Sequence, residues 1–338
     1  MGKKEHISIA ERCVGLNQPP FMIAEMSGNH NQSLSKAIEI VDAAAEAGAD
    51  AIKLQTYTAD SMTLDIKGGE FEIKDKKSLW SGQNLHDLYK KAYTPWEWHE
   101  EIFKRAKLKN IICFSSPFDN NAVDFLNNLN VPAFKIASFE NNHLPLLEKV
   151  ASTGKPIIIS TGMANLADLE MAVKTIQDSG CSELILLKCT SNYPSSPANS
   201  NLKTIEHMRK LFDVEVGLSD HTIGIGVAIA SVAMGASVIE KHFTLDRSEG
   251  GVDSQFSIEP NELKSLVTEA NRAWESIGKI KYGLTSDEKE SVRFRRSIYT
   301  SKKIKKGEKF NQDNIKIVRP GNGAPPYLYK ELQELNQN

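Results

Sequence analysis

Two histidines in the stretch from Val216 to Asp246 stand where they could hold a metal ion. His221 follows an apolar run that predicts a strand at 215–218, and His242 lies near the end of the next predicted strand, 238–243. Parallel strands joined by a helix end at the same edge of a sheet, so the two imidazoles are expected to converge. Paired imidazoles favour a metal site, whereas isolated ones more often satisfy a local hydrogen bond. The charged neighbours of both histidines favour the site, because burying such a cluster is costly.

Two lysines inside apolar strands are the second chemical signal. Lys53 lies in AIKLQTY and Lys135 in AFKIAS, and a cation buried in a strand needs an anion nearby. Glu25 or Glu240 would supply that anion in a purely structural ion pair. Serines at neighbouring strand ends favour a phosphate or phosphate-carboxylate ligand instead; they are Ser116, Ser138 and Ser160.

The elements that must position these residues alternate regularly. Apolar runs predict eight strands, at 21–26, 51–57, 111–115, 133–137, 156–160, 184–189, 215–218 and 238–243. Helical periodicity between and after them predicts helices at about 33–47, 95–108, 120–128, 144–151, 166–178, 202–211, 225–234 and 260–277. This arithmetic favours a (β/α)₈ TIM barrel over the alternative, a doubly wound open sheet. The long stretch 58–94 interrupts the pattern and is expected to form a lid or substrate wall.

The composition changes after Ile277. We expect a catalytic barrel at 1–277, a charged linker at 278–290 and a small module with little core at 291–338. The lysines and arginines of that module are read as a solvated face, with anion binding as the alternative.

The totals exclude several classes of function. A net charge of −2 in 338 residues gives no electrostatic reason to expect nucleic acid as a partner. No apolar run has the length of a membrane span, and neither a leader nor a membrane is expected. Four scattered cysteines predict reduced thiols in a cytoplasmic protein. One of them, Cys189, is expected to pack in the core, with a nucleophilic role as the alternative.

Nine motifs in order resemble the sialic acid synthase family: AEMSGNHNQS, KLQTY, SSPFD, FKIASFE, ISTGM, KCTSNYP, GLSDHT, EKHFTLD and RPGNGAPP. The resemblance covers nearly the whole chain and likens its C-terminal module to the antifreeze-like (SAF) domain of those enzymes. LWSGQNLHDLYKKAYTPWEWH and CTSNYP are most similar to the pseudaminic branch. One departure is Ser191, which stands where many members have asparagine, so that role does not pass to Ser191, and Asn192 is left as an unassigned substitute.

The resemblance implies that phosphoenolpyruvate condenses with the open-chain aldehyde of an acetamido sugar and releases phosphate. In the pseudaminic branch the sugar is 2,4-diacetamido-2,4,6-trideoxy-L-altrose. The two histidines would hold Mn²⁺ or Mg²⁺. Lys53 and Lys135, with the three serines, would hold phosphoenolpyruvate. Glu25 would activate the attacking water; the alternative is that it serves only as an ion-pair partner of Lys53. Glu240 would steady a water molecule bound to the ion.

Further residues are assigned by resemblance alone. Gln55, Glu140, Tyr193 and Asp253 would contact the sugar. The resemblance also implies a homodimer with exchanged C-terminal modules, in which Arg319 of one chain closes the sugar site of the other; a surface arginine acting in neither site is the alternative.

Three alternatives stay open at the level of sequence. The first is a neuraminate or legionaminate synthase with the same reaction and another sugar. The second is a metal-dependent aldolase or lyase on the same barrel, which the paired strand lysines disfavour. The third is a non-catalytic scaffold that carries a glycan- or ice-binding module.

Overall fold

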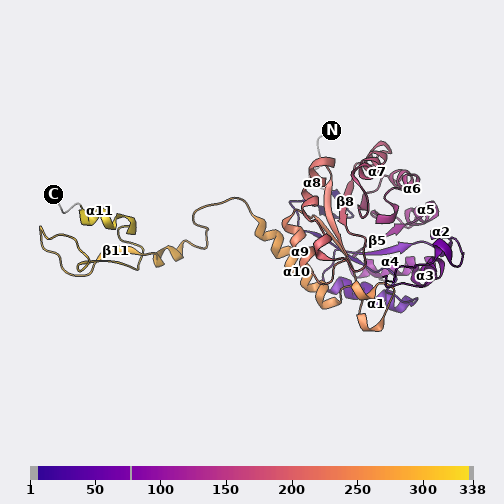
Figure 1. Ribbon diagram of the computed structural model, residues 1–338, viewed down its shortest axis with the longest axis horizontal. Helices are drawn as coiled ribbons and strands as arrows, with labels where there is room; N and C mark the ends of the chain where they lie inside the picture. Colours follow the sequence, from indigo (N-terminus) through magenta and orange to yellow (C-terminus); the bar gives the residue numbers. More distant parts are fainter. Residues whose placement is uncertain (1–6, 77, 335–338) are drawn as a thin grey trace. The chain divides into compact units, whose positions relative to one another are not determined.

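The computed structural model describes residues 7–76 and 78–334, which form two compact units, Met1–Ile277 and Gly278–Asn338 (Figure 1). Each unit is described by itself.

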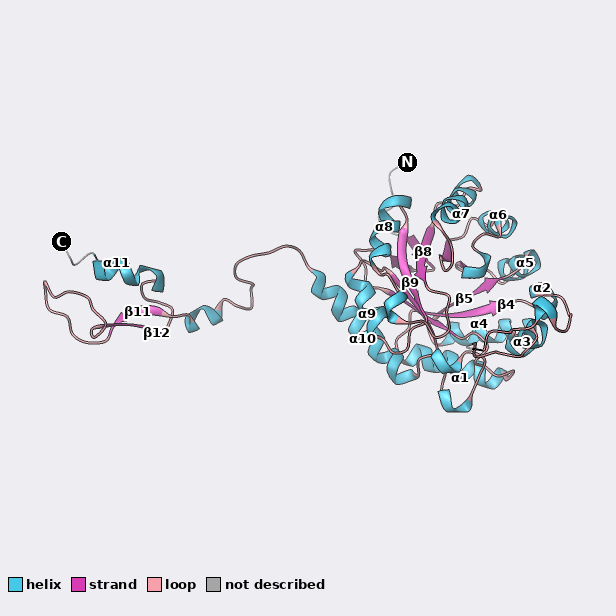
Figure 2. Cartoon of the chain, viewed as in Figure 1, coloured by secondary structure: helices cyan, strands magenta, loops and turns pink. Residues whose placement is uncertain are grey.

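The first unit is a closed barrel of parallel strands surrounded by helices (Figure 2). Its strand order is β10-β3-β4-β5-β6-β7-β8-β9, and closure comes from β10 pairing with β3, with Val238 opposite Phe21. The (β/α)₈ prediction is confirmed, and the open sheet is wrong. The strands are β3 (Phe21–Glu25), β4 (Ala51–Thr56), β5 (Ile112–Pro117), β6 (Phe134–Ile136), β7 (Ile157–Ser160), β8 (Leu184–Cys189), β9 (Glu215–Asp220) and β10 (Val238–His242).

The barrel helices agree closely with the periodicity of the sequence. Four have the predicted bounds, and the others differ by a few residues. Local capping explains some of these limits: the side chain of Asp119 accepts a hydrogen bond from the N–H of Ala122, and Asn165 caps the next long helix in the same way. The helices are α1 (Leu34–Glu46), α4 (His99–Leu108), α5 (Asn120–Asn128), α6 (Leu144–Ala151), α7 (Leu166–Asp178), α8 (Lys203–Phe212), α9 (Gly226–Ala233) and α10 (Pro260–Ile277).

Three local features differ from the sequence-based expectation. The ragged start is a two-stranded antiparallel hairpin, β1 (Ile7–Ile9) and β2 (Arg12–Val14), too short to show a period. A 3₁₀ turn at Trp96–Trp98 precedes α4, so that helix begins after, not at, Pro95. The insertion at 58–94 carries two short helices, α2 (Ala59–Met62) and α3 (Leu85–Ala92).

Burial on both faces explains why the barrel strands read as continuous apolar runs. All five residues of β3 and all four of β7 are buried, since one face meets the barrel interior and the other meets the helices. The polar exceptions among these strand residues, such as Glu25 and Lys53, therefore stand out against an apolar background.

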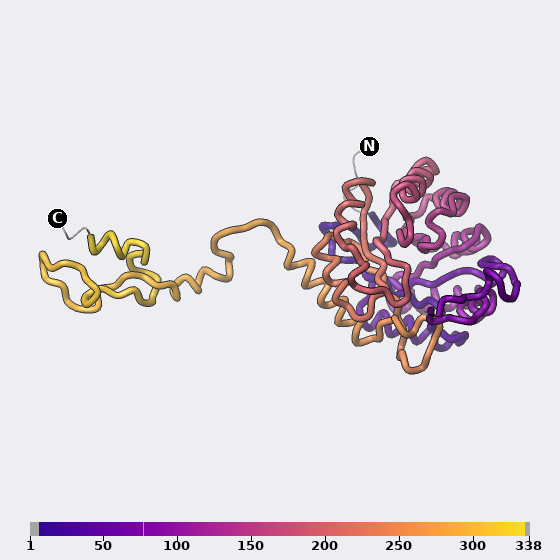
Figure 3. The backbone as a smooth tube through the Cα atoms, in the orientation of Figure 1, coloured from indigo at the N-terminus to yellow at the C-terminus, as the bar shows by residue number. Residues whose placement is uncertain are grey.

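The second unit pairs β11 (Ser297–Thr300) with β12 (Ile315–Val318) in antiparallel register and ends in the helix α11 (Tyr329–Glu334), as the chain trace shows (Figure 3). Only Ile298 and Ile315 are buried hydrophobic residues among its described positions. Throughout the described parts of the chain, no helix has the length and apolarity required to cross a membrane.

Candidate active site

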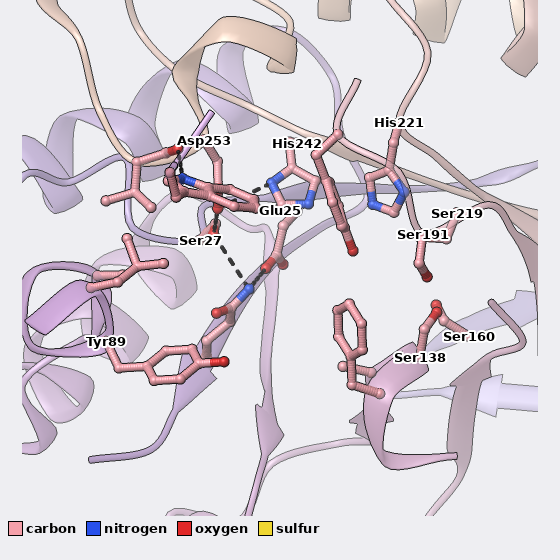
Figure 4. Close-up of a pocket in the computed structure, with 18 of the residues that line it drawn as sticks. Glu25, Ser27, Tyr89, Ser138, Ser160, Ser191, Ser219, His221, His242 and Asp253 are labelled. Carbon is pink, nitrogen blue, oxygen red and sulfur yellow. Dashed lines mark hydrogen bonds and ion pairs between the residues drawn. The ribbon is translucent and has the colours of Figure 1, made fainter. Parts of the chain in front are cut away.

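A cavity of about 640 Å³ opens where the barrel strands end (Figure 4). Residues from β3, β4, β6, β7, β9, β10 and the loops after the strands line it, so side chains distant in sequence meet there. Twelve of the fourteen residues predicted for the site line this cavity: Glu25, Lys53, Gln55, Lys135, Ser138, Glu140, Ser160, Tyr193, His221, Glu240, His242 and Asp253.

Lys53 lies at the base of the cavity in contact with both carboxylates of the site. Its Nζ is 2.5 Å from Oε2 of Glu25 and 4.0 Å from Oε2 of Glu240. It also donates a hydrogen bond to Oγ of Ser116, at 3.3 Å. Ser116 does not line the cavity, so it contacts Lys53 from behind.

Lys135 lies near the other oxygen of the Glu240 carboxylate. Its Nζ donates to Oγ of Ser160 at 2.7 Å and to the carbonyl of Ile136 at 3.0 Å, and it lies 3.6 Å from Oε1 of Glu240. Burial lowers the pKa of Lys135, although Glu240 opposes that shift. The site therefore holds two buried lysine side chains around one shared carboxylate.

The two carboxylates respond differently to burial. Burial raises the pKa of Glu25 to about 7, with Lys53 opposing the shift. Burial also acts to raise the pKa of Glu240, but Lys135 and Lys53 outweigh it and leave that pKa lowered. Near neutral pH, Glu25 therefore exchanges protons readily while Glu240 stays ionised. When Glu25 is protonated, two ammonium groups face one carboxylate, and the excess positive charge suits an anionic ligand.

The two predicted metal ligands do lie together, with ring centroids 5.2 Å apart. The carbonyl of Thr190 accepts a hydrogen bond from Nδ1 of His221, at 3.1 Å, which places the proton on Nδ1 and leaves Nε2 as a free donor of electrons. His242 is buried, and its Nδ1 has no hydrogen-bond partner. Burial lowers the pKa of His242 well below its usual value, so this ring is neutral, as a metal ligand must be.

The donor set fits an ion held by two histidines with positions left open for other ligands. Among the described residues, no group of three or more His, Cys, Asp or Glu is arranged to hold an ion. The carboxylate of Asp253 lies beside the pair, with Oδ2 3.7 Å from Nδ1 of His242. Water and substrate would have to complete the coordination, which is the arrangement of a catalytic rather than a structural site.

Cys189 lies behind the histidines and outside the cavity lining. Its Sγ is 3.8 Å from Nδ1 of His221, and the residue is buried. Burial acts to raise the pKa of the thiol, but the hydrogen bond with His221 and the neighbouring Ser138 and Lys135 outweigh burial and bring the pKa to about 7. The packed position agrees with the core role expected for this cysteine.

The outer part of the cavity combines hydrogen-bonding groups with an apolar wall. Gln55 donates from Nε2 to Glu25 at 2.8 Å and to Ser27 at 3.3 Å, and Ser27 donates in turn to Asp253. Tyr193 covers His221, with ring centroids 4.5 Å apart. The apolar wall comes largely from the insertion and consists of Met62, Ile73, Leu85, Leu88, Tyr89 and Phe118.

The sequence did not indicate Ser27 and Trp80 as candidate site residues, although both line the cavity. Ser27 meets Asp253 across 226 positions, and Trp80 donates from Nε1 to the carbonyl of Val252 at 2.9 Å across 172 positions. Trp80 also packs on Tyr193, with centroids 5.8 Å apart. Trp80 was indicated only as part of the long insertion and of the motif LWSGQNLHDLYKKAYTPWEWH, and neither predicted this contact. Arg319 lies in the second unit, where its side chain is exposed.

The chain is similar to known proteins both in sequence and in fold. The sequence model of the NeuB family matches residues 40–282, and that of the SAF domain matches residues 295–332. Pseudaminic acid synthase of Campylobacter jejuni is 45% identical over 92% of this chain and 90% of its own length; the Helicobacter pylori enzyme of that name is 43% identical over 93% and 92%. A crystal structure of N-acetylneuraminic acid synthetase from Leptospira borgpetersenii superposes with a TM-score of 0.75, at 34% identity over 86% of this chain and 96% of that one.

Proposed function

The chain belongs to the NeuB family, with an SAF domain at its C-terminal end, and from this premise we propose that it makes pseudaminic acid. It condenses phosphoenolpyruvate with 2,4-diacetamido-2,4,6-trideoxy-L-altrose and releases inorganic phosphate. The observation that carries this function is the 45% identity to a pseudaminic acid synthase across 92% of the chain. The family membership confirms the resemblance that the nine sequence motifs predicted.

The paired lysines support a site for phosphoenolpyruvate. Lys53 and Lys135 are buried, lie around one carboxylate and are backed by the hydroxyls of Ser116 and Ser160. The negative charge of a bound substrate would take over part of the pairing with the two lysines that Glu25 and Glu240 provide. Ser138, which lines the same cavity, offers a further hydroxyl. Holding phosphoenolpyruvate on this side fixes one face of its double bond toward the sugar aldehyde, and positioning of this kind supplies much of a rate enhancement.

Glu25 is the group best suited to move a proton in this reaction. After carbon–carbon bond formation, C2 of the former phosphoenolpyruvate must accept water before phosphate leaves by C–O cleavage. A carboxyl with a pKa of about 7 can take the proton of that water at neutral pH. Glu240 stays ionised between the two lysines and stabilises positive charge developing at C2.

A divalent ion, Mn²⁺ or Mg²⁺, would bind at His221 and His242. When bound, the ion polarises the sugar aldehyde as a Lewis acid, which is worth several kcal/mol. The free Nε2 of His221 and the unpartnered Nδ1 of His242 support this assignment. Of the two ions, the transition metal accepts imidazole nitrogen more readily.

The lining beyond the histidines supports a 6-deoxy sugar. Gln55, Glu140, Tyr193 and Asp253 offer hydrogen bonds to hydroxyl and acetamido groups, while the hydroxyl of Tyr89 is the one hydrogen-bonding group among the six side chains of the apolar wall. A C6 methyl group can pack against such a wall without leaving a polar partner unsatisfied. An apolar wall discriminates only modestly against an added hydroxyl, by about a hundredfold or less.

We also propose a cytoplasmic homodimer in which a barrel formed by 1–277 and an SAF module formed by 291–338 are joined by the linker 278–290. Arg319 of one chain would then reach the sugar site of the other, where its planar donors suit acetamido carbonyls. Opposite charges support docking of the module on a barrel, since residues 278–338 hold 14 Lys and Arg against 7 Asp and Glu. All four cysteines are free, as expected for a reducing compartment.

A panel of sugars tests the proposed function. Phosphate release from phosphoenolpyruvate is measured with the 6-deoxy diacetamido altrose, with N-acetylmannosamine and with the sugar precursor of legionaminic acid. We expect the highest kcat/KM for the altrose. A higher value for either of the other sugars would move the chain to another branch of the family, and no phosphate release with any sugar would reject the synthase reaction.

A further inference from the structure

A closed ring of hydrogen bonds surrounds the backbone of His221. Asp220 accepts through Oδ1 from the N–H of Thr222, at 3.0 Å, and through Oδ2 from the hydroxyl of Thr222, at 3.1 Å. Nζ of Lys241 donates to Oδ2 of Asp220 at 2.7 Å and to the carbonyl of Thr222 at 2.6 Å. The residues before and after His221 are thus both held by Lys241, the neighbour of His242.

The ring lies on the face of the sheet turned away from the cavity. Glu240 and His242 line the cavity, so Lys241 between them points to the opposite face. In the pairing of β9 with β10, Lys241 stands directly opposite Asp220. Both residues are buried, with 1% and 3% of their surface exposed. No substrate in the cavity can touch this pair, so it acts, if at all, through its neighbours.

Stability alone is a weak reason for such a pair. The cost of removing two charges from water commonly cancels their attraction, and an apolar pair of similar volume is often as stable. What an apolar pair cannot do is hold both the N–H and the carbonyl of one turn. Here that turn carries one proposed metal ligand, and the lysine that holds it is bonded in sequence to the other.

We propose that Asp220, Lys241 and Thr222 position His221 and His242 at the separation that one divalent ion requires. The inference rests on the proposed metal site and adds residues that do not themselves contact the ion. Asp220 sets the turn in which His221 lies. Lys241 then ties that turn to β10 one residue before His242, so the two imidazoles cannot move apart independently. Groups that orient metal ligands in this way typically contribute 10- to 100-fold to metal affinity.

The experiment compares metal affinity with stability in the full-length chain freed of metal. The first variant, Lys241→Met, keeps the apolar stem and deletes the donor. The second, Asp220→Asn/Lys241→Met, leaves no unpaired buried charge and keeps an acceptor for the N–H of Thr222. The dissociation constant for Mn²⁺ is measured from the electron paramagnetic resonance signal of free Mn²⁺, and Tm is measured by circular dichroism.

Arg209→Met is the matched control. Nη2 of Arg209 donates to Glu215 at 3.1 Å and to the carbonyl of Val216 at 2.9 Å, so it also joins a carboxylate and a backbone carbonyl. That contact lies at the opposite end of β9. If the role of Lys241 is purely structural, Lys241→Met and Arg209→Met should both lose stability. Their affinities for Mn²⁺ should then be equal.

We expect Lys241→Met and the double variant to bind Mn²⁺ at least about tenfold more weakly, while Arg209→Met binds it as the unmodified chain does. If Lys241→Met does not fold, the double variant decides. Unchanged Mn²⁺ affinity in the folded double variant would overturn the positioning role and leave the proposed function standing. Unchanged affinity in His221→Ala and His242→Ala would instead overturn the metal site, and the positioning role with it.

Discussion

The barrel and the C-terminal unit differ in what holds them together. The barrel strands are buried on both faces and surrounded by helices, whereas the described part of the smaller unit buries only Ile298 and Ile315 among its hydrophobic residues. Their charges are opposite in sign: residues 1–277 hold 27 Lys and Arg against 36 Asp and Glu, while residues 278–338 hold 14 against 7. The barrel can keep a precise set of polar groups in place because apolar packing fixes its backbone.

This difference in packing determines which unit can hold a buried polar site and which can act only through surface residues. Buried lysines and carboxylates need a rigid surrounding, because an unpaired buried charge is costly, and the barrel supplies that surrounding. The small basic unit has little core to fix a site of its own. Its contribution is expected to come from surface residues such as Arg319, presented to an acidic barrel.

The largest effect should follow from removing a buried charge of the barrel. Replacing Lys53 or Lys135 with Met deletes an ammonium group that faces the proposed anion and leaves a buried carboxylate without its partner. We expect phosphoenolpyruvate to bind at least about 100-fold more weakly, as measured by isothermal titration calorimetry. Lys188→Met is the control, because Lys188 lies in β8 outside the cavity lining. Unchanged binding in both site variants would refute the phosphate site.

The next effect concerns the C-terminal unit. Arg319→Ala should lower kcat/KM for the sugar by about tenfold or more, because it removes the cation that we propose contacts the bound sugar, and it should leave phosphoenolpyruvate binding unchanged. If the arginine serves the partner chain, mixing inactive Lys53→Met with weakened Arg319→Ala chains under subunit exchange should restore activity. Demonstrated exchange without recovery would exclude action in trans, and full activity of Arg319→Ala alone would exclude any role in the reaction.

The sequence predicts the barrel and most residues of the site, but not the contacts made by the long loops. Regular alternation of apolar runs was enough for the barrel, because strands buried on both faces and amphipathic helices leave distinct periods. Strand ends located the lysines, histidines and Glu25, since parallel strands share one edge. The Ser27–Asp253 and Trp80–Val252 contacts depend on how long loops fold over the cavity, and no local pattern records that. The hairpin at β1 and β2 was missed because three residues show no period.

A smaller effect should appear in the pH profile of the barrel chemistry. The pKa of Glu25 is raised to about 7, and its ionised form is the one that accepts a proton. Activity should therefore fall as pH decreases, by about tenfold in kcat between pH 8 and pH 6. The pKa of Glu140 is also raised to about 7 by burial, so Glu140→Gln must keep this acidic limb if Glu25 causes it. If Glu140→Gln loses the acidic limb, Glu140 and not Glu25 is the group that titrates in the pH profile.

The smallest effect should be the dependence of sugar binding on salt concentration. Raising the ionic strength from about 0.1 M to 1 M shortens the screening length from about 10 Å to 3 Å, which weakens attraction between an acidic barrel and a basic module. We expect a severalfold increase in KM for the sugar and no more than a small change in the Tm of the barrel. Replacing Lys305 and Lys306 with Gln should reduce this salt dependence; an unchanged dependence would argue against electrostatic docking of the module.

The most direct test of the whole account follows the atoms of phosphoenolpyruvate. Substrate labelled with ¹⁸O in the bridging position is turned over with 2,4-diacetamido-2,4,6-trideoxy-L-altrose, and both products are analysed by mass spectrometry. We expect pseudaminic acid without label and inorganic phosphate that carries the bridging ¹⁸O, because the C–O bond breaks after water adds at C2. Unlabelled phosphate, or phosphate released without a nine-carbon keto acid, would contradict it.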